Sequence, residues 1–438
     1  MYRMTRRSLL AAGAAVAIAP GELLAAGRAG FTNKQLESIR ASASEAVASG
    51  DIPGVIQLIW KDGRTRYTHR AGLRDIERKL PMEQSTIFNI ASMSKPVTVA
   101  LALTLVDEGR MRFDDPISRW APEFANMRVL KKADGPLDDT YPASRAITIE
   151  DLMTHRSGLT YGFLARGPLA GALYSQFGTG IDSKLTPDAW MQALAAMPLM
   201  YAPGERFVYG HSIDVLGFVV ARALNTTLRE AMLERLFRPL RMADTDFWIP
   251  PGKRARMAQN YYSPAPREFV RTDLSSFVED RPRAYTSGGQ GLVSTADDYL
   301  TFARMLLQGG AVNRVRVLRP ETVKRMTSNQ MTDAQLKAPP VSGISFAPGQ
   351  GFGLGMSVVM DSAVYKGWGG VGSFGWGGAF GGWWQGDPRN NMVMLWLQQC
   401  LPAPPVPGKP LAPRIPGLRG TIEFQKQTYE GLRSDAMG

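Results

Sequence analysis

The segment ASMSKP at residues 91–96, followed by the apolar run VTVALALTLVDEG at 97–109, organises the fold that we expect for this chain. Proline is tolerated in the first turn of a helix, where its missing N–H would have no partner, so Pro96 places the helix start about four residues earlier. Ser92 then lies at the helix N-terminus, where its backbone N–H can donate a hydrogen bond to a developing oxyanion. Lys95 lies one turn along the same face, with its amine within reach of the Ser92 hydroxyl.

A serine followed three residues later by a lysine points to nucleophilic catalysis. The hydroxyl is a weak nucleophile until a base takes its proton, and a neutral lysine can serve as that base. To be neutral near pH 7, the lysine must lower its pKa by roughly 3 units, at a cost of about 4 kcal/mol. The apolar residues on both sides supply burial. The alternative is that Ser92 only caps a helix beside a surface Lys95, because the SxxK pattern alone often arises by chance.

Strand patterns lie near both ends of the chain, and helix patterns fill its middle. Alternating apolar residues predict two strands around a turn at 61–63 and a second strand–turn–strand unit at 379–399. Helical periodicity is found at 32–50, 186–197, 212–224, 294–310 and 420–432. We therefore predict an α+β fold in which about 30–114 and 285–438 form an antiparallel sheet flanked by helices. A mostly helical lobe, about 115–284, would leave a cleft beside it.

The first 29 residues have the features of a twin-arginine signal peptide. The Arg6-Arg7 pair precedes the small apolar run AAGAAVAIAP, and alanines suited to cleavage follow. A transmembrane anchor is the alternative, but the apolar run is shorter than the roughly 20 residues needed to span a bilayer. We therefore expect a periplasmic or secreted mature protein of residues 30–438, with no stable membrane anchor after signal removal.

Composition excludes several function classes for this chain of 438 residues. The formal net charge of +12 suggests nucleic acid, but the basic residues are scattered among acidic ones, so we expect no nucleic-acid binding. The single cysteine, Cys400, rules out an internal disulfide, and the three histidines are too dispersed for a paired metal site. We expect no metal and no cofactor, and the sequence leaves the oligomeric state open.

Five motifs in order resemble the serine beta-lactamase-like superfamily, and within it class C beta-lactamases and family VIII carboxylesterases. They are SMSK at 92–95, LMTHRSGL at 152–159, PGERFVYGHSIDVLG at 203–217, SGGQGLVSTADDYLTFARMLL at 287–307 and SFGWGGAFG at 373–381. The likeness covers roughly residues 35–400. Each motif is weak alone, but five in the right order make chance an inadequate explanation. The resemblance implies a beta-lactamase or penicillin-binding-protein-like fold.

The resemblance also implies roles for individual residues. Ser92 would be the acylated nucleophile, Lys95 its base partner and Tyr209 the second member of the proton-relay pair. The oxyanion would be held by the backbone N–H groups of Ser92 and Ala379. The alternative is that Tyr209 has a structural role only, as an aromatic residue packed in a loop with its hydroxyl hydrogen-bonded.

Two departures from the family pattern bear on the substrate. Where beta-lactamases commonly carry asparagine two residues after the tyrosine, this chain has His211, which would contact substrate or simply pack. Trp376, Gly377 and Gly378 replace the lysine-threonine-glycine type motif as substrate-binding residues, and esterases of family VIII show this kind of WGG. We therefore expect a carboxylesterase that forms an acyl-enzyme on short-chain neutral esters. The alternatives are a beta-lactamase or D-alanyl-D-alanine peptidase, and a non-enzymatic exported binding or sensor domain.

Rival motifs are weaker. GHSID at 210–214 nearly matches the GxSxG elbow, but Asp214 replaces the last glycine and Ser212 begins a helix pattern. GWGGVG at 367–372 matches a dinucleotide-binding pattern, although no helix pattern follows it. His155 is expected to be structural, holding a turn after a short helix.

Overall fold

An eight-stranded antiparallel sheet joins the two ends of the chain in the computed structural model, which describes residues 31–178, 183–272, 279–339, 341, 346–365, 367–402 and 414–434. The strand order is β12-β13-β14-β15-β16-β1-β2-β3. These strands are β1 Gly54–Lys61, β2 Arg64–Asp75, β3 Leu80–Pro81, β12 Gln350–Phe352, β13 Ser357–Val359, β14 Phe374–Gly377, β15 Trp383–Asp387 and β16 Met392–Gln398. The α+β fold and its antiparallel sheet are thus confirmed. The signal peptide expected at 1–29 lies outside the described residues.

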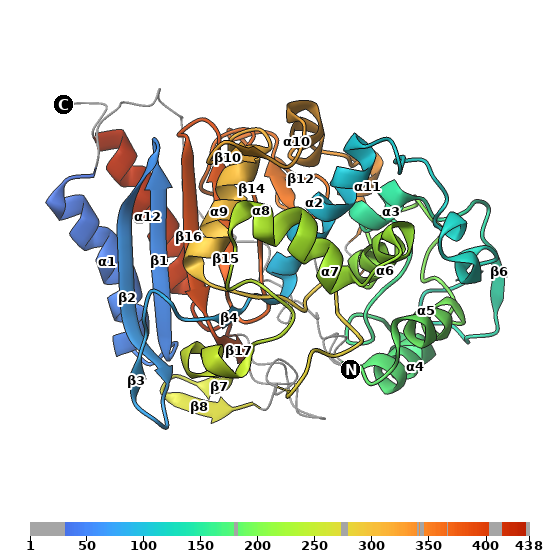
Figure 1. Cartoon of the computed structure of the whole chain (residues 1–438), viewed down its shortest axis with the longest axis horizontal. Coiled ribbons are helices and arrows are strands. Elements are labelled where there is room, and N and C mark those ends of the chain that lie inside the picture. The colour runs from blue at the N-terminus through green and yellow to red at the C-terminus, as the bar shows by residue number, and fades with distance from the viewer. Residues whose placement is uncertain are drawn as a thin grey trace.

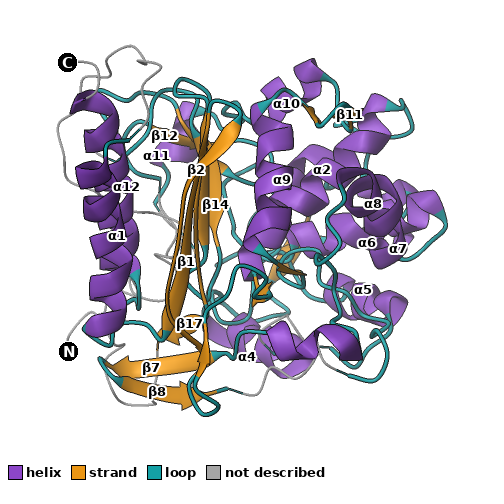
Figure 2. Ribbon diagram, turned by 60° about the vertical axis from the view of Figure 1, so that its left-hand side comes forward, coloured by secondary structure: helices purple, strands orange, loops and turns teal. Residues whose placement is uncertain are grey.

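Helices cover both faces of this sheet, as Figure 2 shows. The terminal helices α1 (Asn33–Ala48) and α12 (Leu418–Ser434) pack against each other on one face, and α9 (Ala296–Leu307) packs on the other. Every residue of β1 is buried, because the strand pairs on both edges and is covered on both faces. This explains why the sequence VIQLIW is apolar at nearly every position.

The first hairpin forms where the sequence predicts it. Asp62 and Gly63 connect β1 to β2 and have φ angles of 49° and 86°, the left-handed pair that a two-residue hairpin turn requires. The second strand–turn–strand unit is also confirmed, as β15 and β16. A proline-rich stretch at 402–416, which the sequence indicates is a surface connection, lies mostly outside the described residues.

The middle of the chain forms a lobe of short helices beside the sheet part (Figure 1). They are α3 Ile149–Met153, α4 Gly167–Phe177, α5 Pro187–Ala195, α6 Ser212–Leu224, α7 Leu228–Met232 and α8 Arg238–Leu240. Two further short helices, α10 (Pro320–Met326) and α11 (Asp333–Lys337), precede β12. No helix among the described residues is long and apolar enough to cross a membrane.

Smaller sheets complete the structure. Their strands are β4 Phe88–Asn89 with β9 Val293–Ser294, β5 Arg128–Leu130 with β6 Thr140–Pro142, β10 Ala311–Val312 with β11 Val315–Arg316, and β17 Cys400–Pro402 with β7 Tyr261–Ala265 and β8 Glu268–Arg271. The sequence pattern did not predict β7 and β8. β7 pairs with β8 as a local hairpin and with the C-terminal β17 on its other edge, whereas the sequence assigned these residues to the helical lobe. The pairing of β7 with β17 joins segments far apart in the chain and leaves no local signal.

The helix α2 (Ser94–Asp107) lies between the sheet part and the lobe. All of its residues from 94 to 105 are buried, and it contacts α6 of the lobe. A helix that is apolar on every side is stable only when it is covered all round. This helix therefore joins the two parts of the molecule, and the residues at its N-terminus lie where those parts meet.

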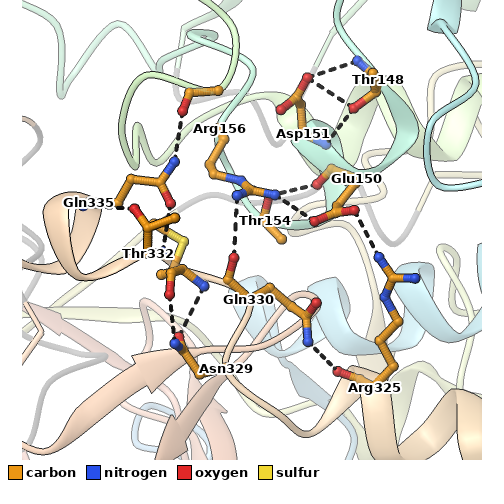
Figure 3. A network of polar contacts seen from close by, with 12 residues as sticks. Thr148, Glu150, Asp151, Thr154, Arg156, Arg325, Asn329, Gln330, Thr332 and Gln335 are labelled. Atoms are coloured by element: carbon orange, nitrogen blue, oxygen red, sulfur yellow. Dashed lines mark hydrogen bonds and ion pairs between the residues drawn. The ribbon is translucent and has the colours of Figure 1, made fainter.

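An ionic network fixes α3 of the lobe to the region of α10 and α11 (Figure 3). The Glu150 carboxylate accepts hydrogen bonds from Arg156 at 2.7 Å and from Arg325 at 2.9 Å. Arg156 also donates to the backbone carbonyl of Gln330 at 3.3 Å. Because these groups are only partly exposed, solvent screens them less than ordinary surface pairs. The network anchors the turn that carries His155.

His155 is fully buried in this turn and has a φ of 53°. Its backbone carbonyl accepts a hydrogen bond from Val208 at 2.7 Å, while neither ring nitrogen has a partner among the described residues. The ring packs 4.6 Å from the ring of Tyr209, between centroids. Burial, and secondarily the charge of Lys95, hold the pKa of His155 well below its usual value. The imidazole is therefore neutral in the folded protein.

We expect this neutral histidine to make folding stability depend on pH. The unfolded chain binds a proton at His155 near pH 6.5 and the native state does not, so the free energy of unfolding falls as the pH drops below 6.5. His155→Phe removes that proton uptake. The stability of the variant relative to wild type should rise by about 1.5–2 kcal/mol between pH 7 and pH 5, measured by urea unfolding. Parallel pH dependences of the two proteins would contradict this account.

Candidate active site

Ser92 lies in a tight turn directly before α2. Residues Ala91–Met93 form a 3₁₀ turn, so the α-helix begins at Ser94, two residues later than expected. Ala91 has a φ of 42°, a left-handed conformation that is uncommon for residues other than glycine. The Asn89 side chain holds the turn by accepting from the Ala91 backbone N–H at 3.0 Å. Pro96 lies in the first turn of α2, as predicted.

The Lys95 side chain is completely buried. Its Nζ donates hydrogen bonds to the Ser92 hydroxyl at 3.0 Å and to the Gly289 carbonyl at 2.8 Å. The amine also lies over two aromatic rings, 4.5 Å from the centroid of Tyr209 and 5.5 Å from that of Tyr161. A buried amine needs such partners, because removing an unpaired charge from water is very costly.

Tyr209 approaches the same serine from the lobe. Its hydroxyl lies 2.9 Å from the Ser92 hydroxyl oxygen and accepts a hydrogen bond from the Trp376 indole at 3.3 Å. The tyrosine is 3% exposed. The structure thus brings Tyr209 of the lobe to the segment that carries Ser92 and Lys95, with all three side chains around one hydroxyl oxygen.

Gly378 and Ala379 follow β14 and lie next to the turn that carries Ser92. A Cβ atom on Gly378 would lie 2.5 Å from the Ile90 carbonyl oxygen, so this close approach requires glycine. The exposed Ala379 is the next residue of the same turn. The backbone N–H groups of Ser92 and Ala379 have no hydrogen-bond partner in the part of the chain that the structure describes. Both donors remain free for a ligand.

Trp376 lies in β14 and is 4% exposed. Its ring packs edge-on against Phe352 at 5.3 Å and at a tilt against Tyr209 at 5.8 Å. The sequence analysis assigns Trp376 to substrate binding, and its indole has one N–H donor. In the structure that donor is bonded to the Tyr209 hydroxyl. Gly377, the next residue, ends β14 in register with Trp383.

His211 is 1% exposed and lies among aromatic rings. Its Nδ1 atom is 3.1 Å from the Asp214 carboxylate, and its ring packs edge-on against Tyr161 at 4.5 Å and Trp190 at 5.2 Å. The sequence left two roles open for His211, contact with substrate or packing. In this structure its ring packs against neighbouring aromatic rings.

The rival serine, Ser212, is fully buried at the start of α6, as the sequence predicts. Its hydroxyl lies 2.8 Å from the Ser157 hydroxyl. It therefore lacks the exposed position that a nucleophile elbow gives its serine.

Sequence reasoning missed three groups around the lysine: Tyr161, the loop Ser287–Gly289 and Asp214. Asp214 is fully buried and accepts hydrogen bonds from Ser287 and from the Gly289 backbone. The available signal was a carboxylate inside the apolar run SIDVLGFVV, since buried charges are rare unless paired.

No cluster of metal-ligating side chains occurs in the described ranges. Cys400 lies at the start of β17, where burial raises the pKa of its thiol to about 12. The thiol is therefore protonated at neutral pH and a poor nucleophile.

Comparisons with known proteins agree on the family of this chain. The Beta-lactamase family profile matches residues 39–412. Uncharacterized protein MT1414 of Mycobacterium tuberculosis is 42% identical over 91% of this chain and 99% of its own. Esterase EstB of Burkholderia gladioli is 30% identical over 81% of this chain and 87% of its own.

A solved structure agrees with these sequence matches. EstCE1, described as a hydrolase with promiscuous acyltransferase activity, superposes with a TM-score of 0.75 at 25% identity, covering 90% of this chain and 99% of its own. The shared fold, the esterase relative and the family profile lead to the same conclusion. This chain belongs to the Beta-lactamase family, as a serine hydrolase of the beta-lactamase fold with esterase and acyltransferase homologues.

Proposed function

We propose that this protein is a carboxylesterase that hydrolyses short-chain neutral esters through Ser92, Lys95 and Tyr209. One observation carries the proposal: the Ser92 hydroxyl oxygen lies within hydrogen-bond distance of both the Lys95 amine, at 3.0 Å, and the Tyr209 hydroxyl, at 2.9 Å. A nucleophile with two adjacent proton-transfer groups is the arrangement that covalent acyl transfer requires. The similarity to an esterase supports the choice of ester substrates.

The first half of the reaction forms an acyl-enzyme. Ser92 loses its proton to the Lys95–Tyr209 pair as its oxygen attacks the ester carbonyl. The resulting oxyanion accepts hydrogen bonds from the free N–H groups of Ser92 and Ala379. The tetrahedral intermediate collapses, the C–O bond to the alcohol breaks, and the Lys95–Tyr209 pair returns the proton to the leaving alkoxide.

The second half releases the acid. Water gives a proton to the Lys95–Tyr209 pair and adds its oxygen to the acyl carbonyl. Collapse of this second intermediate breaks the bond to Ser92, which recovers its proton. The Trp376 indole donates to the Tyr209 hydroxyl at 3.3 Å, and such a bond strengthens whenever the tyrosine oxygen carries negative charge.

Preference for a neutral substrate follows from the same indole. Beta-lactams and D-alanyl peptides carry a carboxylate near the scissile bond, and a lysine at position 376 would bind it with roughly 1.5–3 kcal/mol. Tryptophan has one neutral donor, and here that donor is bonded to Tyr209. The site thus lacks this source of carboxylate affinity, while the indole face suits uncharged groups.

The nucleophile can be tested with two serines. Ser92→Ala should abolish hydrolysis of an aryl butyrate and labelling by a fluorophosphonate probe, because the attacking oxygen is gone. Ser212→Ala is the matched control and should retain most of both activities, since that hydroxyl is buried against Ser157. Undiminished labelling of Ser92→Ala would remove the basis of the proposal.

The proton relay predicts a graded loss of turnover. Tyr209→Phe should lower kcat by at least about 100-fold, the scale of lost acid–base assistance. Trp376→Phe keeps the ring but removes the donor, so we expect a loss of about 10-fold in kcat with little change in KM. Steady-state kinetics and melting temperatures of the purified variants check both values. Full activity of Tyr209→Phe would show that another group carries the proton.

Substrate charge supplies a separate test. We expect kcat/KM for a neutral aryl butyrate to exceed that for a carboxylated cephalosporin by at least about 100-fold, equivalent to about 2.7 kcal/mol. Spectrophotometric assays of the same preparation with both chromogenic substrates measure this ratio. Similar values would favour the beta-lactamase or peptidase alternative over the esterase.

A further inference from the structure

We infer that Asp214 is a positioning residue for this reaction: its buried carboxylate holds the loop Ser287–Gly289, whose carbonyl orients the Lys95 amine toward Ser92. The inference rests on the proposed function, because it assigns Lys95 the role of base. Among the described residues, Asp214 makes no contact with Ser92 or with the backbone N–H groups of Ser92 and Ala379. Asp214 would therefore act on the reaction indirectly, through the loop Ser287–Gly289 and through its negative charge.

The carboxylate of Asp214 has four donors around it. One oxygen accepts from the Ser287 hydroxyl and from the Gly289 backbone N–H, the latter at 2.9 Å. The other oxygen is 3.1 Å from His211 Nδ1 and 3.4 Å from the Tyr161 hydroxyl. A carboxylate buried this completely is stable only when its acceptor positions are used, and here both oxygens are engaged.

Gly289 connects this carboxylate directly to the catalytic lysine. Its N–H donates to Asp214 and its carbonyl accepts from Lys95 Nζ at 2.8 Å. A Cβ atom on Gly289 would lie 2.9 Å from the Tyr161 hydroxyl and 3.0 Å from the Asp214 carboxylate, so a larger residue here would displace one of these two side chains. The neighbouring Gly288 carbonyl accepts from the Thr98 hydroxyl of α2 at 2.6 Å. The loop is thereby fixed to α6 on one side and to α2 on the other.

The charge of Asp214 persists despite its burial. Burial by itself would raise the pKa of this carboxyl, but the hydrogen bond and electrostatic attraction from His211, the Ser287 hydrogen bond and the Lys95 charge outweigh it, and the pKa lies below its ordinary value. Asp214 is therefore ionised at neutral pH. The attraction between two charged groups is mutual, so the carboxylate also stabilises positive charge that develops near Lys95.

Other titratable groups face this pair from several elements. Tyr209 and Tyr161 face the Lys95 amine, and burial raises the pKa of Tyr161 well above its usual value, which keeps it neutral. His155 also faces the amine and is neutral, as described above. His211 and Tyr161 face Asp214 itself. Among these groups, Asp214 supplies the negative charge at neutral pH.

This charge has a defined effect on proton transfer. Lys95 must accept the Ser92 proton and hold it while the oxyanion forms, so a nearby carboxylate favours the step. Removing that charge makes the amine a weaker base, which slows acylation. Loss of a buried negative charge also makes protonation of the site as a whole less favourable, so we expect the acid limb of the pH–rate profile to move toward lower pH.

The variant Asp214→Asn tests the charge while keeping the shape. Its amide oxygen can still accept from Ser287 and Gly289. Its NH₂ group faces the Tyr161 hydroxyl and His211 Nδ1, and both can accept once the imidazole carries its proton on Nε2. We expect fluorophosphonate labelling of Ser92 to slow by about 10-fold at its plateau. The midpoint of its acid limb should fall by about 1 pH unit, the smaller end of what one nearby charge produces. An unchanged rate and midpoint in a folded variant would overturn the inference.

The matched control is Ser287→Ala, which removes one donor to the loop and leaves the charge in place. It should lower kcat for the aryl butyrate by about 3- to 10-fold, with KM unchanged and no shift of the acid limb to lower pH. Ser287→Ala also tests the inference if Asp214→Asn does not fold. A kcat of Ser287→Ala within 2-fold of wild type would then show that the position of the loop does not depend on Asp214, and would overturn the inference. If the acid-limb midpoint of Ser287→Ala moved as far as that of Asp214→Asn, the shift would be a structural effect rather than an effect of charge. That result would also overturn the inference.

Labelling separates this inference from the proposed function. If Ser92→Ala retains labelling, the nucleophile is wrong and both fail. If Ser92→Ala is inert while Asp214→Asn matches wild type in rate and midpoint, only the role of Asp214 fails. If Asp214→Asn shows the expected shift in the pH dependence of labelling but the wild-type protein hydrolyses no ester, the positioning role of Asp214 is supported and the proposed esterase activity is wrong.

Discussion

A fully buried amine is the constraint on which the rest of the site depends. Lys95 is 0% exposed, and an ammonium without partners in such a place would cost many kcal/mol, so the surrounding chain must supply them. The Gly289 carbonyl, the Ser92 hydroxyl and the face of Tyr209 do so. The contacts that stabilise the buried Lys95 amine also orient it toward the Ser92 hydroxyl. The same set of contacts therefore stabilises the fold around Lys95 and positions the amine in the candidate site.

These partners come from separate segments of the chain, and the fold brings them together. Ser92 and Lys95 lie at the start of α2, Tyr209 precedes α6 in the lobe, and Trp376 lies on β14 of the sheet. Because α2 is covered by both parts, its N-terminus is the point where all three segments meet. The site is complete only when lobe and sheet are docked, and the ionic network around Glu150 is one of the links that dock them.

Much of the fold was predictable, because its signals are local. The hairpin turn at Asp62 and Gly63, the alternation in β15 and β16, and the proline in the first turn of α2 can each be read within a short window. The SxxK spacing places Ser92 and Lys95 together for the same reason, since three residues make about one helical turn.

The rest depends on contacts between residues far apart in the sequence. The pairing of β7 with β17 joins Tyr261 to Cys400, and no short window contains both strands. The indole of Trp376 was identified as a site residue, but its bond to Tyr209 depends on how β14 meets the lobe. Asp214 was noticed only as a departure from the GxSxG elbow, because its role requires knowing that Gly289 lies between it and Lys95.

Under the proposed mechanism, the Trp376 indole links the proton relay to the choice of substrate. Trp376 is 4% exposed and packs on Phe352, so a charged side chain placed there would enter an apolar wall rather than open solvent. Such a cation would lie beside the Tyr209 hydroxyl, and the Lys95 amine lies over the ring of the same tyrosine, so the two amines would repel each other. A neutral donor avoids both costs: it supports the tyrosine oxygen without adding a charge. In the proposed mechanism, the residue that withholds affinity from carboxylates therefore also keeps a second cation away from Lys95.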